Sequence, residues 1–387
     1  MKNINVLIGA DLVPTKSNYD LFCQGKINEI FDDKLLKIFN NSDFSIFNLE
    51  TPLIDKSTPI KKWGPNIGIK YNVINGIKKI NPGFLNLANN HIMDHGNEGL
   101  LSTIKVLNEN NISYSGVYYS NSMKHSFIKI VNGFSIGIYS CVEHEFSVAS
   151  EGNWGANPFD IFESYKHVEE LSNKCDFVIV LYHGGKEFYP YPSPDLQKYC
   201  RRFIDCGADF VVCQHSHCIG CEETYDNKKI VYGQGNVLFD DGTKNDEWQN
   251  GLLLDIEINK HKLININYIV LTRKNNGVLL SEKEISNKLL NDYFDRSKAI
   301  LKSNFIQEKY SEFAMSKVYD IFRKFDLIGS SFLFRILNKI TKKKFGKFYF
   351  NKIYLKKKSY EIENAIDCEA WRELTLTYLK FYNLKKQ

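Results

Sequence analysis

The sequence predicts an α/β fold, in which short apolar strands alternate with amphipathic helices. Residues 177–182 and 210–212 are apolar, β-branched runs of the kind that form buried strands. Residues 98–107 space their apolar side chains three and four positions apart, as an amphipathic helix does. A third feature is that several strand-like runs end directly in an acidic, amide or imidazole side chain. Because ligands bind at the carboxyl ends of strands in open α/β sheets, this feature predicts a functional site along one sheet edge.

The length and composition allow one large domain and an appendage. The chain has 387 residues, of which 43% are hydrophobic and 14% aromatic, which is typical of a globular protein. The pattern turns helical from residue 281, so we predict an α/β domain over 1–280 and a helical extension over 281–387. Residues 296–358 hold seventeen Lys or Arg against four Asp or Glu, a net +13, so the rest of the chain carries about −8. The extension is therefore basic, and it is rich in aromatic residues.

The nine cysteines are odd in number and irregularly spaced, which favours reduced thiols in a cytoplasmic protein over a disulfide framework. Cys213, Cys218 and Cys221 lie close together, but a zinc site would need a second Cys-x-x-Cys pair, so free thiols are favoured. The apolar run at residues 4–9 is too short for a signal peptide or a membrane anchor. We interpret it as the first strand of the fold.

The first half of the chain supplies acidic and amide groups at its strand ends. The strand at 4–8 leads to Asp11, and after a polar helix at 33–40 the strand at 44–47 leads to Glu50, each followed by a proline that turns the chain. The strand at 84–88 leads to Asn90 and His91, with Asp94 just behind.

Loops near these strand ends have two interpretations each. The loop at 56–70 carries Lys62 and Trp63, which suit an anionic substrate, although a solvated linker is equally consistent with the sequence. A helix at 98–107, a short strand at 112–116 and a hairpin around Asn132-Gly133 follow. The long loop at 143–160 is predicted to be a lid or a substrate wall.

The second half of the chain supplies histidines. A helix at 162–173 precedes the strand that ends in His183, and a helix from Ser193 to about Cys206 precedes the strand that ends in His215 and His217. A strand at 229–232 ends in Gly-Gln-Gly-Asn236, where glycines permit close approach to a crowded site, and Asn236 is predicted to contact the substrate. Two alternating runs, 252–258 and 263–271, predict an edge hairpin.

The polar groups at the strand ends come from five separate segments and share one chemistry. They are carboxylates, an amide and imidazoles, with no cysteine, which suits manganese, iron, zinc or magnesium acting on an oxyanion substrate. We therefore predict one or two divalent ions held by residues from the set Asp11, Glu50, Asn90, His91, His183, His215 and His217. The remaining histidines are predicted to be surface or capping residues: His95, His125, His144, His167 and His261.

At these residues the sequence resembles the CapA-type capsule or poly-γ-glutamate synthesis proteins, within the calcineurin-like metallophosphoesterase superfamily. The resemblance covers about residues 4–240. It rests on six motifs in order: Gly-Ala-Asp11, Asn-Leu-Glu50-Thr-Pro, Leu-Ala-Asn-Asn90-His91 with Asp94-His-Gly, Tyr-His183-Gly-Gly, Gln-His215-Ser-His217, and Gly-Gln-Gly-Asn236-Val-Leu-Phe-Asp.

The resemblance implies a four-layer α/β/β/α sandwich with a metal centre at the carboxyl edges of two sheets. It further implies that Asp11 and His217 hold one ion, that Glu50 bridges, and that His91 stays unligated and protonates a leaving oxygen. The other ion would be held by three residues: Asn90, His183 and His215. Two such ions about 3.5–4 Å apart can clamp a phosphoryl group and activate a water.

One departure from the superfamily pattern bears on the number of ions. A histidine is expected two residues after the first aspartate, but Leu12 and Val13 follow Asp11 here. One ion would lose a ligand, so a single-metal centre or a weakly held second metal is the alternative to a two-metal centre.

Two functional hypotheses follow. The first is a metal-dependent, phosphoesterase-like hydrolase in capsule, exopolysaccharide or polyglutamate biosynthesis. The second is a non-catalytic accessory protein that binds an anionic polymer in a biosynthesis or export complex. No phosphate-binding loop, dinucleotide fingerprint or Gly-x-Ser-x-Gly elbow occurs, and no nucleic-acid partner is predicted.

The basic extension has two interpretations of its own. Its lysines, at 342–344 and 356–358, are interleaved with apolar runs too short to span a bilayer. The extension could lie on the anionic inner face of the membrane or hold an acidic glycan, or its helices could pack on the main domain with solvated lysines. The oligomeric state is not predicted.

Overall fold

The computed structural model describes residues 3–62, 64–119, 122–150, 152–240, 246–260, 262–324 and 332–354, and it confirms the mixed α/β fold. The chain divides into two compact units, residues 1–310 and 311–387. None of the helices described in these ranges is both long enough and apolar enough to cross a membrane.

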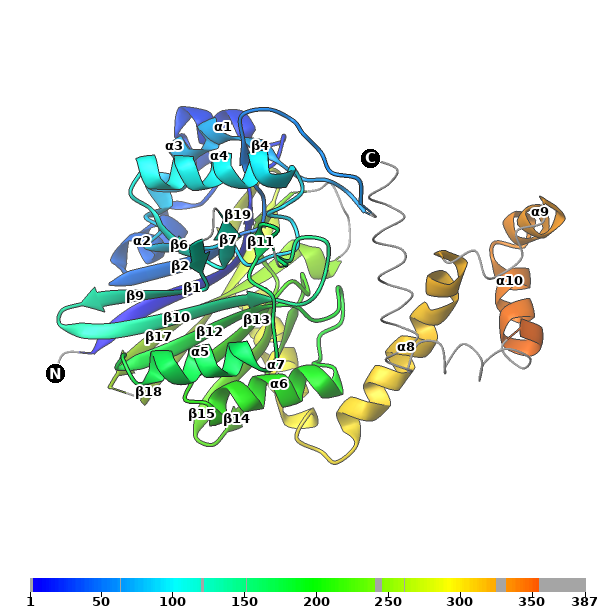
Figure 1. The fold of residues 1–387 in the computed structure, drawn as a ribbon. Helices are drawn as coiled ribbons and strands as arrows, with labels where there is room; N and C mark the ends of the chain where they lie inside the picture. The colour runs from blue at the N-terminus through cyan, green and yellow to red at the C-terminus, as the bar shows by residue number, and fades with distance from the viewer. Residues whose placement is uncertain are drawn as a thin grey trace. The chain divides into compact units, whose positions relative to one another are not determined.

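The first sheet has eight strands in the order β19-β18-β17-β1-β2-β5-β6, with β16 paired to β1 (Figure 1). Strands β1, β2, β5 and β6 are parallel, and β17, β18 and β19 are antiparallel to their neighbours. Its strands are β1 (Ile4–Val13), β2 (Phe44–Leu49), β5 (Phe84–Asn86), β6 (Ser113–Ser115), β16 (Asn236–Phe239), β17 (Asn250–Asn259), β18 (Lys262–Lys274) and β19 (Gly277–Leu280). The predicted hairpin is β17–β18, but it does not form the edge, because β17 pairs with β1 and β19 lies outside β18.

The second sheet has six strands in the order β14-β15-β13-β12-β10-β9. Its central strands β10, β12, β13 and β15 are parallel, so their carboxyl ends share one edge. The strands are β9 (Ser126–Val131), β10 (Phe134–Val142), β12 (Phe177–His183), β13 (Phe210–Gln214), β14 (Ile219–Tyr225) and β15 (Lys228–Gln234). Two small sheets complete the fold: β7 (Val117–Tyr119) with β8 (Ser122–Lys124) and β11 (Gly155–Ala156), and β3 (Leu53–Ile54) with β4 (Ile69–Lys70).

Three apolar clusters show that the two sheets pack face to face between two layers of helices. The central cluster joins inward side chains of both sheets, among them Ile8 and Ile46 of the first and Ile179 and Val212 of the second. The outer face of the first sheet packs on one helical layer: α1 (Tyr19–Gln24), α2 (Asp33–Asn41), α3 (Ile74–Ile77) and α4 (Gly96–Glu109). The outer face of the second sheet packs on α5 (Glu163–Ser172) and α6 (Pro194–Asp205). This arrangement confirms the four-layer α/β/β/α sandwich (Figure 1).

Helix α6 shows how local sequence sets an element that aims the site. Ser193 caps it by accepting the Leu196 N–H at 3.1 Å, and Pro194 occupies the first turn, where no backbone donor is needed. The helix buries Leu196, Cys200 and Phe203 against the second sheet, and Gly207 turns the chain into β13 with a φ of 100°. The strand thereby delivers His215 and His217 at its end.

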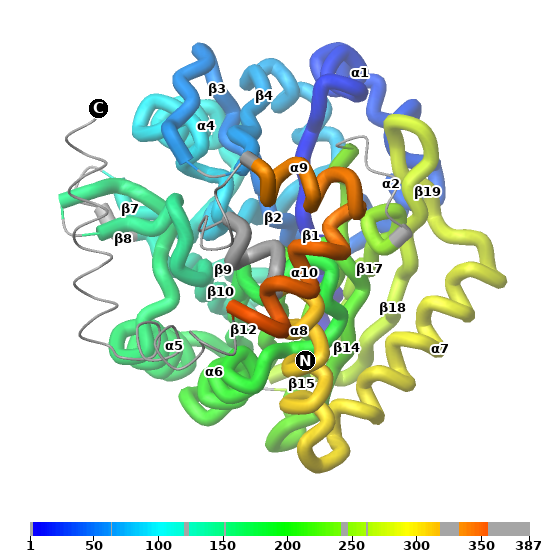
Figure 2. The backbone as a smooth tube through the Cα atoms, turned by 90° about the vertical axis from the view of Figure 1, so that its right-hand side faces the viewer, coloured from blue at the N-terminus to red at the C-terminus, as the bar shows by residue number. Residues whose placement is uncertain are grey.

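The first compact unit continues past residue 280. Helix α7 (Lys283–Ala299) packs along β14 and β18 (Figure 2), and its Tyr293 is fully buried in the cluster between the two sheets. Helix α8 (Phe305–Lys324) begins in the first unit, and Ile300 and Ile306 join the cluster under α6. The predicted boundary at 280 and 281 stays a prediction, whereas the packing divides the chain after Tyr310.

The described part of the second unit is helical. It contains α9 (Phe332–Ile340), α10 (Lys344–Tyr349) and a π-helical turn over Phe350–Tyr354. The Phe334 ring packs on Phe345 and Tyr349, each with centroids 5.4 Å apart. The second lysine cluster, 356–358, lies outside the described residues.

Candidate metal centre

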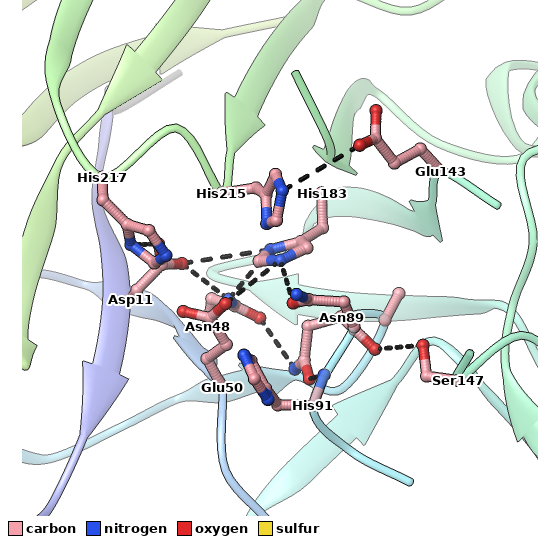
Figure 3. A network of polar contacts seen from close by, with 12 residues as sticks. Asp11, Asn48, Glu50, Asn89, His91, Glu143, Ser147, His183, His215 and His217 are labelled. Atoms are coloured by element: carbon pink, nitrogen blue, oxygen red, sulfur yellow. Dashed lines mark hydrogen bonds and ion pairs between the residues drawn. The ribbon is translucent and has the colours of Figure 1, made fainter. Parts of the chain in front are cut away.

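The carboxyl ends of both sheets bring the predicted metal ligands together, and Figure 3 labels five of them: Asp11, Glu50, His183, His215 and His217. The sixth, Asn90, contacts His183. Asp11 lies on β1 opposite Asn48 of β2, and His183 is the last residue of β12, opposite Gln214 of β13. Glu50 and His215 directly follow β2 and β13, whereas His217 and Asn90 lie three and four residues after the ends of β13 and β5. The parallel register therefore places residues far apart in sequence at one edge.

His183 lies at the middle of the network and is fully buried. Its Nε2 is 3.0 Å from Asn90 Oδ1 and 3.4 Å from Glu50 Oε1. Its Nδ1 is 3.2 Å from Asn48 Nδ2, whose amide also donates to Asp11 Oδ1 at 2.7 Å. Asn48 thus fixes both the ring and the carboxylate.

His217 is held by polar groups on one side and aromatic rings on the other. Its Nδ1 lies 3.4 Å from Asp11 Oδ2 and 2.9 Å from Asn236 Oδ1. The Trp248 ring packs on the imidazole with centroids 4.4 Å apart. Asn236, which the sequence predicted as a substrate contact, therefore orients a predicted ligand; its contact with substrate stays a prediction.

His215 turns its two ring nitrogens to different surroundings. Nε2 is 3.9 Å from Glu143 Oε1, and the other Glu143 oxygen accepts the Gly185 N–H at 3.0 Å. Nδ1 is buried and has no hydrogen-bond partner among the described residues. Figure 3 shows Glu143 to one side of His215, and His217 and Asp11 to the other.

Several buried polar atoms at this edge make no hydrogen bond within the described ranges, although two of them lie 3.4 Å from an imidazole nitrogen. They are Asp11 Oδ2, both carboxylate oxygens of Glu50 and His215 Nδ1. Glu50, His215 and His217 each offer a donor atom within 4.8 Å of the others, and so do Glu143, Glu145 and His215. Because a buried charge without a partner is costly, such converging atoms fit a divalent cation. The residues present therefore suit the metal that the sequence predicts.

The electrostatics of the network depend on the two carboxylates. Burial opposes a charge on His217, but Glu50 and Asp11 outweigh it and raise the pKa of His217 to about 9. Burial also opposes a charge on His183, whose pKa the Glu50 carboxylate nevertheless raises. Burial, together with the imidazoles of His183 and His217, holds the pKa of His215 well below its usual range. His215 is thus neutral near pH 7, as a metal ligand must be.

The backbone at the two histidines adopts conformations that non-glycine residues rarely occupy. His215 has a φ of 100° and His217 a φ of 51°. Gly233, at the end of β15, passes so close that a Cβ there would lie 2.6 Å from Ser216 Oγ. The close approach of the backbone that the sequence predicted at this glycine is present. Gly233 therefore packs against the strained turn that carries the two histidines.

The position of the missing histidine is apolar. Val13 is buried in a cluster with Phe239 and Trp248, the rings that pack on His217. Leu12 points to the helical layer and is fully buried. Neither side chain has a donor atom, so neither can supply the histidine ligand that the superfamily pattern implies beside Asp11.

His91 belongs to a separate polar group beside the ligands. Its Nδ1 is 2.6 Å from Asp94 Oδ2, and the other Asp94 oxygen pairs with the Lys62 ammonium. Lys62 Nζ is also 3.4 Å from His91 Nδ1, and its side chain is almost fully buried. Lys62 therefore contacts the predicted acid rather than solvent, and Trp63 lies outside the described residues.

Sequence reasoning did not assign four residues that position this site: Asn48, Asn89, Asp94 and Glu143. Asn48 lies two residues before Glu50, and Asn89 directly before Asn90; Asn89 Nδ2 donates to the Leu49 carbonyl at 2.9 Å. The polar runs at both strand ends were a usable signal for them. The sequence places Asp94 behind His91 without giving it a role, although its partner His91 is only three residues away. Glu143 gave no comparable local signal, because its partner His215 comes from another segment.

Comparisons with known proteins agree with the motifs. Residues 6–241 match a family model described as "Bacterial capsule synthesis protein PGA_cap". A "Capsule biosynthesis protein CapA" of Bacillus anthracis is 28% identical over 212 residues, which are 52% of this chain and 52% of that protein. A "PGA biosynthesis protein CapA" of Bacillus subtilis is 31% identical over 212 residues, 53% of this chain and 55% of that protein. The matched region thus spans about half the length of these curated relatives.

Solved structures show more distant similarity. A hypothetical protein from Thermus thermophilus has a TM-score of 0.47 and 13% identity, covering 70% of this chain and 100% of that one. A phosphatase from Mycoplasma pneumoniae has a TM-score of 0.46 and 15% identity, covering 71% of this chain and 95% of that one.

Proposed function

The chain belongs to the family of bacterial capsule synthesis proteins, and from this premise we propose that it is a metal-dependent hydrolase of a phosphoester or related bond. The pathway would be capsule, exopolysaccharide or polyglutamate biosynthesis. The observation that carries the proposal is the set of buried donor atoms of Asp11, Glu50 and His215 at the sheet edge that make no hydrogen bond within the described residues. An anionic substrate complements a cation held there.

The chain's residues divide into two sets around Glu50. Asp11 and His217 would hold one ion, and Asn90, His183 and His215 the other. One or two bound divalent ions, of manganese, iron, zinc or magnesium, would neutralise a phosphoryl group and bring the pKa of a water towards neutrality. Because Val13 offers no donor, a single ion on the His183 and His215 side is the alternative.

His91 would carry the proton to the leaving oxygen. Asp94 engages Nδ1 at 2.6 Å, which leaves Nε2 as the nitrogen available for transfer. Lys62 and the Ile67 N–H, at 2.7 Å, hold the Asp94 carboxylate. Direct substrate contacts of Lys62, Trp63 and Asn236 remain part of the proposal.

The test is turnover on a panel of phosphomonoesters and phosphodiesters, with chelated protein and after adding manganese back. We expect activity to depend on the metal, and His91→Ala to lower kcat about 100-fold without removing metal. His144→Gln, an exposed histidine beside the site, is the matched control and should keep wild-type activity. Absence of turnover by protein that holds its metal would contradict the proposal.

The accessory-protein function is supported by one observation, the missing ligand at Val13. A centre that holds only one ion could still bind an anionic polymer without cleaving it. Tight binding of poly-γ-glutamate or an acidic glycan that survives His91→Ala, with no turnover by the unmutated protein, would favour this second function.

The proposed location is the cytoplasm, with peripheral contact to the inner face of the membrane through the extension. All eight described cysteines are free thiols. Residues 332–354 contain seven Lys or Arg and no acidic residue, and Leu333 and Ile340 are 72% and 73% exposed.

Replacing Lys342, Lys343 and Lys344 with glutamine should weaken sedimentation with anionic liposomes and leave the melting temperature unchanged. A lower melting temperature without any liposome binding would make the extension structural.

A further inference from the structure

A cavity of about 490 Å³ lies apart from the predicted metal ligands, none of which lines it. It is enclosed by β7, the loop at 149–160 and the start of α5. Its volume falls within the range of small-molecule binding pockets, about 300–1,000 Å³. Nothing in the proposed hydrolysis uses this cavity.

Aromatic rings form its sides. Tyr118, Tyr119 and Trp154 line the opening and are partly exposed. The Tyr119 hydroxyl is paired with Tyr114 at 3.0 Å. The Tyr118 hydroxyl and the Trp154 indole N–H have no hydrogen-bond partner among the described residues. The walls therefore combine flat apolar faces with two donors that a ligand can use.

Its inner wall is polar and preorganised. Tyr139, Asn157 and Ser164 are each only 1% exposed. The Tyr139 hydroxyl donates to Ser164 Oγ at 2.9 Å and accepts from Asn157 Nδ2 at 3.3 Å. Asn157 also donates to the Ser140 carbonyl at 2.6 Å, which holds its amide in place. These groups cost no further ordering when a ligand binds.

The charge of the cavity decides which ligands fit. Asp160 and Glu163 line it, and no Lys or Arg is among the described residues that do. Burial lowers the pKa of His167, the remaining titratable base in the lining, so it is neutral near pH 7. An anionic group would therefore be repelled here, in contrast to the metal centre.

We propose that this cavity binds a sugar ring that carries no acidic group. The C–H face of a sugar ring packs on aromatic side chains, and its hydroxyls bond to amides, carboxylates and the donors described above. The proposal concerns binding only and does not depend on turnover at the metal centre.

The cavity and the metal centre share one loop. Ser147 Oγ donates to the Asn89 carbonyl at 2.8 Å, and Glu143 faces His215, while the following residues of the loop line the cavity. Val142 and Asn157 are joined by a backbone hydrogen bond of 2.9 Å at the base of the loop. One substrate could thus place an uncharged sugar in the cavity and an anionic group at the centre.

The experiment titrates the full chain with cellotriose, tri-N-acetylchitotriose and trigalacturonate, followed by intrinsic fluorescence and saturation-transfer NMR. We expect a neutral trisaccharide to bind with a millimolar or lower Kd and trigalacturonate to bind at least about tenfold more weakly. Trp154→Ala and Tyr118→Ala should each weaken binding by about tenfold or more. Tyr118→Phe keeps the ring and should retain most of the affinity.

Controls separate this site from the rest of the molecule. Tyr191→Ala alters an aromatic residue outside the cavity and should leave binding unchanged, as should chelation of the metal. Circular dichroism establishes that each variant is folded. The proposal is overturned if no neutral sugar binds the folded wild-type chain, if trigalacturonate binds equally well, or if binding is lost on chelation or unaffected in both alanine variants of the cavity.

Discussion

The buried carboxylates of Glu222 and Glu223 differ from that of Glu50 in the hydrogen bonds that their oxygens accept. Glu222 and Glu223 are 5% and 3% exposed, yet every one of their oxygens is paired. Glu223 accepts from Arg201 at 2.6 and 3.1 Å and from Tyr232 at 2.6 Å. Glu50 is equally buried, and neither of its oxygens accepts a hydrogen bond from the described residues.

The difference separates a structural charge from a ligand-binding one. Glu222 accepts from the Tyr268 hydroxyl at 2.6 Å and the Tyr293 hydroxyl at 2.9 Å, and it pairs with Lys229. Such a network joins β14, β18 and α7 and needs nothing from outside. Glu50 makes no hydrogen bond within the described residues and instead lies 3.4 Å from His183 Nε2, so a bound cation would complete its environment. The contrast can be tested by removing one member of each group.

The largest expected effect is on folding, from Glu222→Ala. Loss of the carboxylate leaves the Tyr293 hydroxyl buried without a partner and Lys229 without its ion pair, so the free energy of unfolding should fall by about 3 kcal/mol. Denaturant unfolding measures it. Glu109→Ala, in an exposed pair with Lys105 on α4, should change stability by less than about 0.5 kcal/mol. A loss below about 1 kcal/mol for Glu222→Ala would show that its network is not structural.

The second effect is on metal binding, from Glu50→Gln. We expect the metal affinity to fall about 100-fold, because an anionic ligand is replaced by a neutral one at a site already short of a donor. The stability of the chelated protein should change by less than about 1 kcal/mol. Elemental analysis and melting temperatures with and without manganese measure both quantities. Unchanged metal content would place the ion elsewhere.

The third effect concerns Glu143, which faces His215 Nε2 at 3.9 Å. A carboxylate behind a ligating histidine orients the ring and raises its basicity, and losing it costs about tenfold or more in metal affinity. Glu143→Gln should therefore weaken metal binding by about tenfold in competition with a chelating dye. Glu145→Gln is the matched control. Equal losses in both variants would instead indicate that the two carboxylates act together.

The smallest expected effect concerns two buried histidine nitrogens that make no hydrogen bond within the described residues and lie away from the predicted metal centre. His125 and His167 stack with centroids 4.0 Å apart, and their Nδ1 atoms are buried without partners. Burial, reinforced by the neighbouring His167, lowers the pKa of His125 to about 4. In the unfolded chain the pKa of His125 is about 6.5, so the unfolded chain binds the proton more readily than the folded chain does. The stability that neutral His125 contributes is therefore lost as the pH falls from about 6.5 to about 4.

His125→Asn should flatten that dependence by about 1 kcal/mol, a value reduced for the partial exposure of the ring. Urea midpoints at pH 7 and pH 4.5 for the wild type and the variant measure it. The groups facing His125 include His167 and Glu170, which are unchanged in the variant. Identical pH profiles would mean that the histidines do not resist protonation.

The sequence by itself determined the fold class and indicated which polar residues gather at one sheet edge; their role as metal ligands stays a prediction. Each predicted ligand lies in or after the end of a strand, and the change from an apolar run to a polar group is a local pattern that can be read in a single sequence. Asp11, Glu50, His183 and the pair His215 and His217 could therefore be found without knowing which strands are neighbours. The family motifs added the order in which these residues occur along the chain.

Only the tertiary structure decided which other residues contact and orient the predicted ligands. Glu143 reaches His215 across 72 positions of sequence, and Tyr293 enters the core from a helix that composition assigned to the extension. His125 and His167, predicted to be surface or capping residues, are half-buried and stack on each other; His95 is buried and accepts the Thr58 N–H at 2.9 Å, and His261 lies outside the described residues. The physical reason is that strand order and helix packing set the contacts between segments that are distant in the sequence. A local sequence pattern carries no information about which distant segment packs next to it.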